Sequence, residues 1–302
     1  MPNRRAERPK SDRSLDLLVV GALTIDRFPD GSAAPGGTVL HAARAAARAR
    51  ASVGVVTAAG PEREAQDGLR ELGRIAELQV EGVPETLVFH HDEREGPRRL
   101  LLYGSVRLRP DPGPLQRLHP RALLLAPVAG ELDATALATV DESIEARVRV
   151  AALQGWLRTR DSEGRVTPLD ASDLSHAILA ELRNCDAVVA SHEDLGRTER
   201  HPTAAAGIAL RNLLAGPALL ITWGGAGYVR SEAGTREPTV VGRRTAIAGV
   251  AATTGAGDAF AAIVAIHLAR GASLAAAARA ADAAVDRWLA RQPGATRRGV
   301  TD

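Results

Sequence analysis

Residues 253–260 read TTGAGDAF and open a long Ala-rich apolar stretch. Two glycines around a small residue let successive backbone N–H groups point into one concavity, and a helix that starts there adds positive potential. We therefore predict an anion hole built from Gly255, Ala256 and Gly257. Asp258 follows in the first turn, where its carboxylate can take the proton of an attacking hydroxyl as general base. The alternative is that Asp258 only complements the helix dipole.

The rest of the chain alternates short apolar runs with Ala-rich amphipathic segments. This alternation is typical of βα units around a mostly parallel sheet, because strands buried on both faces are continuously apolar. Two runs near the end, 227–231 and 235–241, predict an antiparallel edge. The fold class is therefore α/β, a doubly wound, mostly parallel sheet flanked by helices. The predicted strands are 15–20, 52–57, 122–126, 147–151, 187–190 and 218–222, and the predicted helices are 38–50, 62–72, 133–139, 173–183, 203–214, 255–270 and 273–290.

One segment departs from the βα alternation. Residues 87–91 and 99–104 are β-prone runs separated by turn-forming residues, which predicts a β-hairpin over about 86–104. The hairpin projects as a lid, or it is simply another edge hairpin. We expect a single domain over 15–292 that includes it, a disordered tail over 1–14 and a C-terminal tail over 293–302.

The composition excludes several classes of protein. Arginine supplies 37 of the 38 basic residues, and Lys10 is the only lysine, so P-loop kinases, protein kinases and Schiff-base enzymes are excluded. The formal net charge is +2 and aromatic residues make up 3%, so we predict no nucleic-acid partner. A single cysteine, Cys185, favours a reducing cytoplasm. The first apolar run, 15–20, is too short for a membrane span, so no membrane partner is expected.

With its flanks, the TTGAGDAF block resembles the PfkB/ribokinase-type carbohydrate kinases, whose hallmark is DTxGAGD before a small-residue helix. The resemblance extends from about residue 15 to residue 290 and implies a ribokinase-like fold. Three other blocks agree with it in order and spacing: GALTID (21–26), PGG (35–37) and TWGGAG (222–227). They imply acceptor binding by Asp26, Gly36 and Gly37, and a donor site bordered by Thr222, Gly224, Gly227, Ser191 and Thr254.

The sequence also departs from this family's pattern. The NxxE motif that organises magnesium is replaced by Ser191-His192-Glu193-Asp194, so Asp194 or Glu193 is implied as an outer-shell metal residue. Ala252 removes a carboxylate that the resemblance associates with a monovalent-cation site, which argues against potassium activation. His41 stands where ribokinases carry a sugar-binding asparagine, which argues against ribose as the acceptor.

Two central blocks resemble the myo-inositol kinase branch of the family. They are PVAGE (127–131) and QGWLR (154–158). Glu131 and Gln154 follow predicted strands, and we expect both to face the crevice where ligands bind in open α/β sheets. Arg158 pairs with phosphate, with an acidic ligand, or with Glu131 as a structural ion pair. His90 and His91 are expected on the hairpin surface.

The resemblance implies an ATP- and Mg²⁺-dependent kinase that phosphorylates a sugar or a cyclic polyol such as myo-inositol. A nucleoside or hexose kinase is the alternative within the family. A catalytically weakened regulatory relative is the alternative outside catalysis. In relatives the lid often takes part in dimerisation, so a homodimer through the hairpin is a further expectation.

Overall fold

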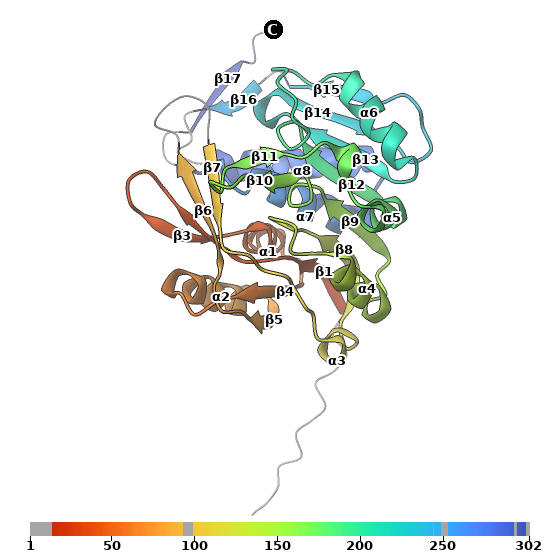
Figure 1. Ribbon diagram of the computed structural model, residues 1–302. Coiled ribbons are helices and arrows are strands. Elements are labelled where there is room, and N and C mark those ends of the chain that lie inside the picture. Colours follow the sequence, from red (N-terminus) through yellow and green to blue (C-terminus); the bar gives the residue numbers. More distant parts are fainter. Residues whose placement is uncertain (1–13, 93–98, 244, 249–252, 293–294, 300–302) are drawn as a thin grey trace, which may run out of the picture.

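A nine-stranded sheet forms the centre of the computed structural model, which describes residues 14–92, 99–243, 245–248, 253–292 and 295–299 (Figure 1). The strand order is β15-β14-β13-β12-β9-β8-β1-β4-β5. Its members are β1 (Ser14–Val20), β4 (Val53–Ala59), β5 (Glu77–Gly82), β8 (His119–Leu125), β9 (Val148–Ala152), β12 (Ala187–Ser191), β13 (Ala218–Thr222), β14 (Gly227–Ser231) and β15 (Thr239–Gly242).

All neighbouring strands from β5 to β13 pair in parallel, and β14 and β15 add an antiparallel edge. At the centre, Val19 of β1 lies opposite Val55 of β4 on one side and Leu124 of β8 on the other. The predicted mostly parallel sheet with an antiparallel edge is confirmed. The edge strand β5 was missed because its sequence, ELQVEG, is largely polar and mostly half-buried or exposed.

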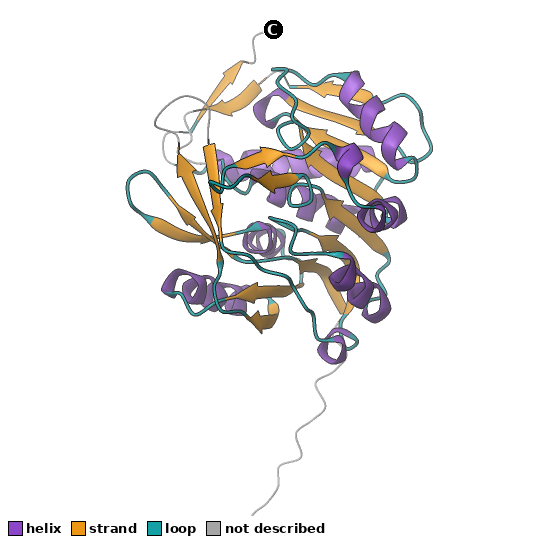
Figure 2. Cartoon of the chain, in the orientation of Figure 1, coloured by secondary structure: helices purple, strands orange, loops and turns teal. Residues whose placement is uncertain are grey.

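Helices cover both faces of this sheet (Figure 2). Alternate residues of β1 face opposite ways: Leu17 and Val19 belong to the core with α1, α2, α7 and α8, and Leu18 and Val20 to the core with the others. The helices are α1 (Thr38–Arg48), α2 (Arg63–Ile75), α3 (Pro112–Leu115), α4 (Ala134–Ser143), α5 (His176–Asn184), α6 (Ala204–Leu214), α7 (Ala256–Ala269) and α8 (Leu274–Leu289). Among the described helices, none is long and apolar enough to cross a membrane.

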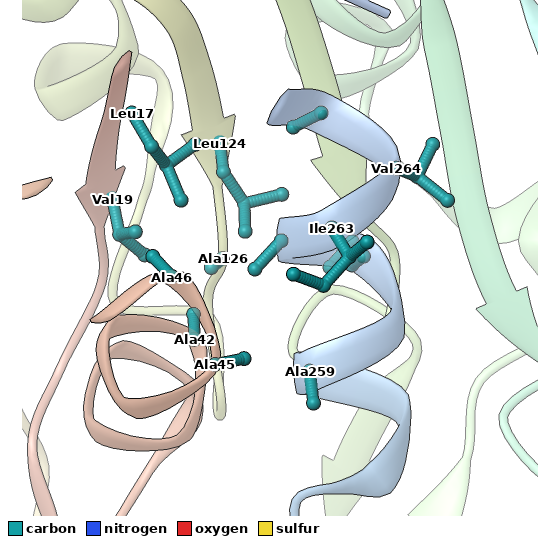
Figure 3. Packing of buried hydrophobic residues seen from close by; sticks show 14 of the residues in the cluster. Leu17, Val19, Ala42, Ala45, Ala46, Leu124, Ala126, Ala259, Ile263 and Val264 are labelled. Atoms are coloured by element: carbon teal, nitrogen blue, oxygen red, sulfur yellow. The ribbon is translucent and has the colours of Figure 1, made fainter. Parts of the chain in front are cut away.

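Helices α1 and α7 face each other across small side chains (Figure 3). Ala45 of α1 and Ala259 and Ile263 of α7 belong to the core that also holds Leu17 and Leu124 of the sheet. Each of these two buried leucines contributes roughly 1.5–3 kcal/mol relative to leaving it exposed. The alanines let the two helices approach closely, and this fixes where their N-terminal ends stand.

A second, four-stranded sheet has the order β3-β2-β6-β7. At one side of it, β6 (Leu87–Asp92) and β7 (Arg99–Tyr103) form the predicted antiparallel hairpin. The other two strands, β2 (Thr24–Arg27) and β3 (Ala33–Gly36), were not predicted, and β2 pairs in parallel with β6. The hairpin is therefore part of a larger lid sheet, which projects from the central sheet (Figure 1).

Two short antiparallel pairs complete the fold. One joins β10 (Arg158–Arg160) to β11 (Val166–Pro168), and the other joins β16 (Thr245–Ala248) to β17 (Thr296–Gly299). Strand β17 lies in the segment expected as a C-terminal tail, and its backbone pairing with β16 ties that segment to the domain. The predicted N-terminal tail lies outside the described residues, apart from Ser14 in β1.

Candidate active site

A cleft of about 270 Å³ opens where the carboxyl ends of the parallel strands meet. It lies at the switch point beside β1, which has β4 on one side and β8 on the other, the position where open α/β sheets bind ligands. The cleft also receives side chains from the lid sheet and from the first turns of α1 and α7. It is lined by these predicted site residues: Asp26, Gly37, His41, Gln154, Ser191, Glu193, Asp194, Thr222, Gly224, Thr254, Gly255, Ala256, Gly257 and Asp258.

The first turn of α7 forms one wall of the cleft. Gly255 caps the helix in the left-handed conformation, with φ 85° and ψ 0°, and contributes no side chain. The Ala256 N–H donates to the Thr253 carbonyl at 3.1 Å, so this donor is already used. For the N–H groups of Gly257 and Asp258 no described residue serves as acceptor. These two donors and the positive helix end leave a place for an anion.

Asp258 is the third residue of α7 and faces the same cleft. Burial raises the pKa of its carboxyl above the ordinary value of 3.8, and the Asp194 carboxylate adds to this rise. His41, Thr38 and Arg158 act in the opposite direction. The result is a buried carboxyl with a raised proton affinity beside an anion site, which is the combination that a general base for a hydroxyl requires.

His41 stands on α1 with its ring against Gly255. Burial lowers the pKa of the imidazole from 6.5, and the Arg44 charge lowers it further, while the Asp258 and Asp26 carboxylates act against this. The ring is therefore neutral near pH 7. Its Nε2 atom is fully buried and has no hydrogen-bond partner among the described residues, so it is available to a ligand hydroxyl.

Two glycines of the first turn give a matched pair of substitutions. A Cβ on Gly255 would lie 2.3 Å from the His41 ring, at a positive φ of 85°, whereas a Cβ on Gly257 meets nothing within 4 Å. We expect Gly255→Ala to lower the Tm and raise the KM for the acceptor, because the ring must move and the backbone is strained. Gly257→Ala should stabilise the fold by about 0.5–1 kcal/mol of helix propensity, so that the Tm stays the same or rises. It should nevertheless weaken donor binding where the anion approaches the backbone. Thermal melts and steady-state kinetics of the two variants check this, and equal behaviour of the two would contradict it.

Asp26 reaches the cleft from the lid strand β2. Its carboxylate is buried, accepts from the Thr24 hydroxyl at 3.4 Å and lies 3.6 Å from His91 Nε2. The His91 ring, expected on the surface, is buried and stacks on Phe28 with centroids 5.0 Å apart. The alternation of β6, in which Phe89 and His91 point inward, was the available signal.

The two consecutive glycines serve different purposes. A Cβ on Gly36 would lie 2.4 Å from the Asp26 carboxylate, so this glycine makes room for Asp26 and does not itself line the cleft. Gly37 has φ 91°, lines the cleft, and a Cβ there would lie 2.6 Å from the Ala22 carbonyl. Gly37 is also the N-cap of α1, and its conformation therefore sets the direction of the helix that carries His41.

Glu131 was expected to face the crevice, and the structure places it elsewhere. Its side chain is fully buried and does not line the cleft. The carboxylate accepts from the N–H groups of Ala22 and Ala129 at 2.9 Å, and from that of Val128 at 2.9 and 3.1 Å. Burial raises its pKa, which the three N–H donors oppose. Glu131 thus satisfies backbone donors inside the fold, and its own lone pairs are occupied by them.

Gln154 and Arg158 remain in the cleft as a pair. With its amide oriented so that the oxygen faces the guanidinium, Gln154 accepts from Arg158 at 2.9 and 3.1 Å. Arg158 Nη1 donates to the Val128 carbonyl at 3.2 Å. The guanidinium also lies 5.5 Å from the centre of the Phe89 ring. The positive charge of Arg158 lowers the pKa of Asp258 in the same cleft. Arg158 therefore acts on Asp258, and not as an ion-pair partner of Glu131, whose carboxylate is bonded to backbone N–H groups.

Residues after β12 and β13 form the other end of the cleft. Ser191 and Asp194 bond reciprocally, from Ser191 N to Asp194 Oδ2 at 3.0 Å and from Asp194 N to Ser191 Oγ at 3.1 Å. His192, which the sequence did not single out, stacks on Trp223 with centroids 5.3 Å apart and also lines the cleft. Gly227 does not line it: a Cβ there would lie 2.1 Å from the Val241 carbonyl, so this glycine serves the pairing of β14 with β15.

The described residues contain no cluster of three or more His, Cys, Asp or Glu that could hold a metal ion by themselves. Glu193 and Asp194 nevertheless place two carboxylates in the cleft, and carboxylate oxygens suit Mg²⁺. Mg²⁺ characteristically takes one or two carboxylates and completes its shell with water and phosphate oxygens, so the residues present fit this ion. Ala252, on which the expectation about a monovalent cation rests, lies outside the described residues.

These features define a class of enzyme. A buried carboxyl in the first turn of a helix, sharing a cleft with a second carboxylate, suits a phosphotransferase that acts on a hydroxyl group. Residues 15–286 match the pfkB family carbohydrate kinases, and the chain belongs to that family. The acceptor is accordingly a hydroxyl of a sugar or polyol.

Solved structures share the ribokinase-like fold. A pyrophosphate-dependent kinase in the ribokinase family, complexed with a pyrophosphate analog and myo-inositol, has 18% identity and a TM-score of 0.71, covering 92% of this chain and 96% of that one. Arabidopsis thaliana ribokinase complexed with ribose and ATP has 17% identity and a TM-score of 0.65, covering 92% and 93%. Fructokinase from Vibrio cholerae has 18% identity and a TM-score of 0.60, covering 90% and 97%. A comparison with curated protein sequences gives no match.

Proposed function

We propose that this protein transfers the γ-phosphoryl group of ATP to a hydroxyl of a sugar or cyclic polyol, with myo-inositol as a candidate acceptor. The observation that carries the proposal is the position of Asp258, a buried carboxyl in the first turn of α7. It shares one cleft with Asp26 and His41, which are suited to bind acceptor hydroxyls. A nucleoside or hexose kinase is the alternative within the family.

In the proposed reaction Asp258 accepts the proton of the attacking hydroxyl. The acceptor oxygen then forms a bond to the γ-phosphorus, the bond from that phosphorus to the β,γ-bridging oxygen breaks, and ADP leaves with the electron pair. The N–H groups of Gly257 and Asp258 stabilise the charge on the transferring group. Asp26 accepts hydrogen bonds from the other acceptor hydroxyls, and neutral His41 orients the reacting one through Nε2.

Asp194 and Glu193 would hold Mg²⁺, most of whose ligands are phosphate oxygens and water. The ion supplies charge neutralisation on the donor phosphates. Ser191, through its reciprocal bonds with Asp194, keeps that carboxylate in place. Thr222, Gly224 and Thr254 line the same end of the cleft and border the donor in this proposal.

The donor and the acceptor are tested together by phosphorus NMR. The protein is incubated with Mg²⁺ and either ATP or pyrophosphate, each against inositols, pentoses, hexoses and nucleosides. We expect ATP consumption that depends on one polyol or sugar and gives one new phosphomonoester. If turnover occurs with pyrophosphate and not with ATP, pyrophosphate is the donor. If it occurs on a nucleoside, the acceptor class is a nucleoside and not a sugar or polyol. ATP binding without turnover on any acceptor would overturn the kinase assignment in favour of a regulatory relative.

A further inference from the structure

A second hollow, of about 390 Å³, shares no lining residue with the active-site cleft. It is formed by the C-terminal ends of α1 and α8 and by one side of α7. We call it the rear pocket. It is lined by Ala45, Arg48, Ala49, Ala259, Ile263, Ala284, Arg287, Trp288, Arg291 and Gln292.

The floor of the rear pocket is made of alanines. Ala45 of α1 and Ala259 of α7 lie on the facing sides of their helices (Figure 3), and Ala284 of α8 completes the floor. Side chains this small do not fill the space between three helices, so an apolar hollow of a size found in small-molecule sites remains. Ile263 and the Trp288 indole add the larger apolar surfaces.

The rim of the rear pocket carries an excess of positive charge. Arg48, Arg287 and Arg291 line it, and none of the described lining residues is acidic. The Arg48 guanidinium lies 5.9 Å from the centre of the Trp288 ring. Burial lowers the pKa of Arg48, and the positive charges of Arg44 and Arg291 lower it further. The nearby Glu71 carboxylate is bonded to Arg44 at 2.6 and 2.7 Å and is not bonded to Arg48. An anion in the pocket would therefore reduce the repulsion between Arg48 and its positively charged neighbours.

We propose that the rear pocket binds a small phosphate monoester, carried on a scaffold of the size of a sugar or a nucleoside. Guanidinium groups bind phosphate through paired, charge-assisted hydrogen bonds, and the three arginines supply them. The scaffold lies on the alanine floor and against the indole, where apolar area is removed from water. The simpler alternative is that Arg48 and Arg287 only complement the negative ends of their helices, which would require neither the hollow nor the indole.

An occupant would touch the two helices that carry the reacting groups. Ala45 lies one helical turn after His41 on α1, and Ala259 directly follows Asp258 on α7. If an occupant shifts either helix, its binding is linked to the cleft that His41 and Asp258 line, and each ligand then changes the affinity of the other by the same factor. This inference goes beyond the proposed function, since it assigns a second site.

Tryptophan fluorescence tests the proposal without any turnover. Trp156 and Trp223 are buried, so Trp288 is the more accessible indole. Glucose 6-phosphate and AMP should each change its emission saturably, and Trp288→Phe should remove that change while any signal from the active site persists. The double variant Arg48→Gln/Arg291→Gln should weaken binding by about tenfold or more, the loss expected for one or two charge-assisted hydrogen bonds. Arg50→Gln, an exposed arginine outside the pocket, is the matched control and should bind normally.

A second variant fills the hollow and leaves the charge unchanged. Ala284→Leu should block glucose 6-phosphate and AMP but still allow inorganic phosphate to bind, and circular dichroism melts of all variants check the fold. Binding of only one of the two esters would decide between the sugar and nucleoside scaffolds. Equal affinities in the wild type and the double arginine variant, or no change in Trp288 emission with any probe, would overturn the proposal. Because no step measures catalysis, this result is independent of whether the protein is a kinase.

Discussion

Replacing Asp258 by Asn is expected to lower kcat by about 10²- to 10⁴-fold, the usual contribution of a general base. The amide has nearly the shape of the carboxylate but cannot take the hydroxyl proton, and the backbone N–H groups of α7 stay in place. Donor affinity, measured by calorimetry, should therefore change little. Asp173→Asn, at an exposed position away from the cleft, controls for the loss of one charge. Near-full turnover by the Asp258 variant would show that another group is the base.

The same substitution has a pH signature. Because burial raises the pKa of Asp258 above 3.8, kcat should fall on the acid side at a pH above that value, and the variant should lack this limb. The folded state favours the protonated carboxyl, so its ionisation at higher pH costs stability in the wild type. Asp258→Asn should consequently have the higher Tm at pH 7, and the difference should vanish below the unfolded pKa. A lower Tm for the variant at pH 7 would contradict the raised pKa.

Glu131→Ala is expected to produce the largest loss of stability. It leaves the N–H groups of Ala22, Val128 and Ala129 buried without their acceptor, at a cost on the order of 3 kcal/mol or more. For a chain of this size that corresponds to a fall in Tm of roughly 6–12 °C. Scanning calorimetry measures it, with the exposed Glu142→Ala on α4 as the control.

Kinetics separate this structural role from a substrate contact. If Glu131 bound the acceptor directly, its removal would raise KM and leave the Tm nearly unchanged. In the conservative variant Glu131→Gln we expect the opposite: the Tm falls and the KM for the acceptor changes little. Its amide N–H₂ faces the same backbone donors and cannot accept from them, so the Tm falls even where the acceptor still binds.

The sequence predicted the sheet because its central strands are buried on both faces and read as apolar runs. Strands β2, β3 and β5 escaped the prediction because they are short or polar, and their pairing depends on partners distant in the chain. The turn that opens α7 was recognisable because TTGAGDAF is contiguous, although the Ala256 N–H, one of the predicted anion donors, is bonded to the Thr253 carbonyl. The position of Glu131 was predicted wrongly because it does not depend on one contiguous motif. A polar residue after a buried strand can face the crevice or turn back onto its own loop, and the path of that loop determines which of the two occurs.

His91 shows a similar limit. The alternation of β6 was visible, but which of its two faces turned inward depended on the parallel pairing of β6 with β2. That pairing joins segments more than sixty positions apart and leaves no mark in either segment alone. The contacts of the cleft that come from one contiguous motif were therefore predictable, and those created between motifs were not.

The two halves of the cleft belong to different sheets. Asp26 lies on β2 of the lid sheet, whereas Asp258 lies on α7, which packs against the central sheet. Only Gly21, Ala22 and Leu23 connect β1 to β2, and Glu131 and Thr57 hold the last two by their N–H groups at 2.9 and 2.8 Å. These two hydrogen bonds restrain the three-residue joint between the sheets. The joint thus helps to set the spacing between the carboxylates of Asp26 and Asp258, by residues that do not line the cleft.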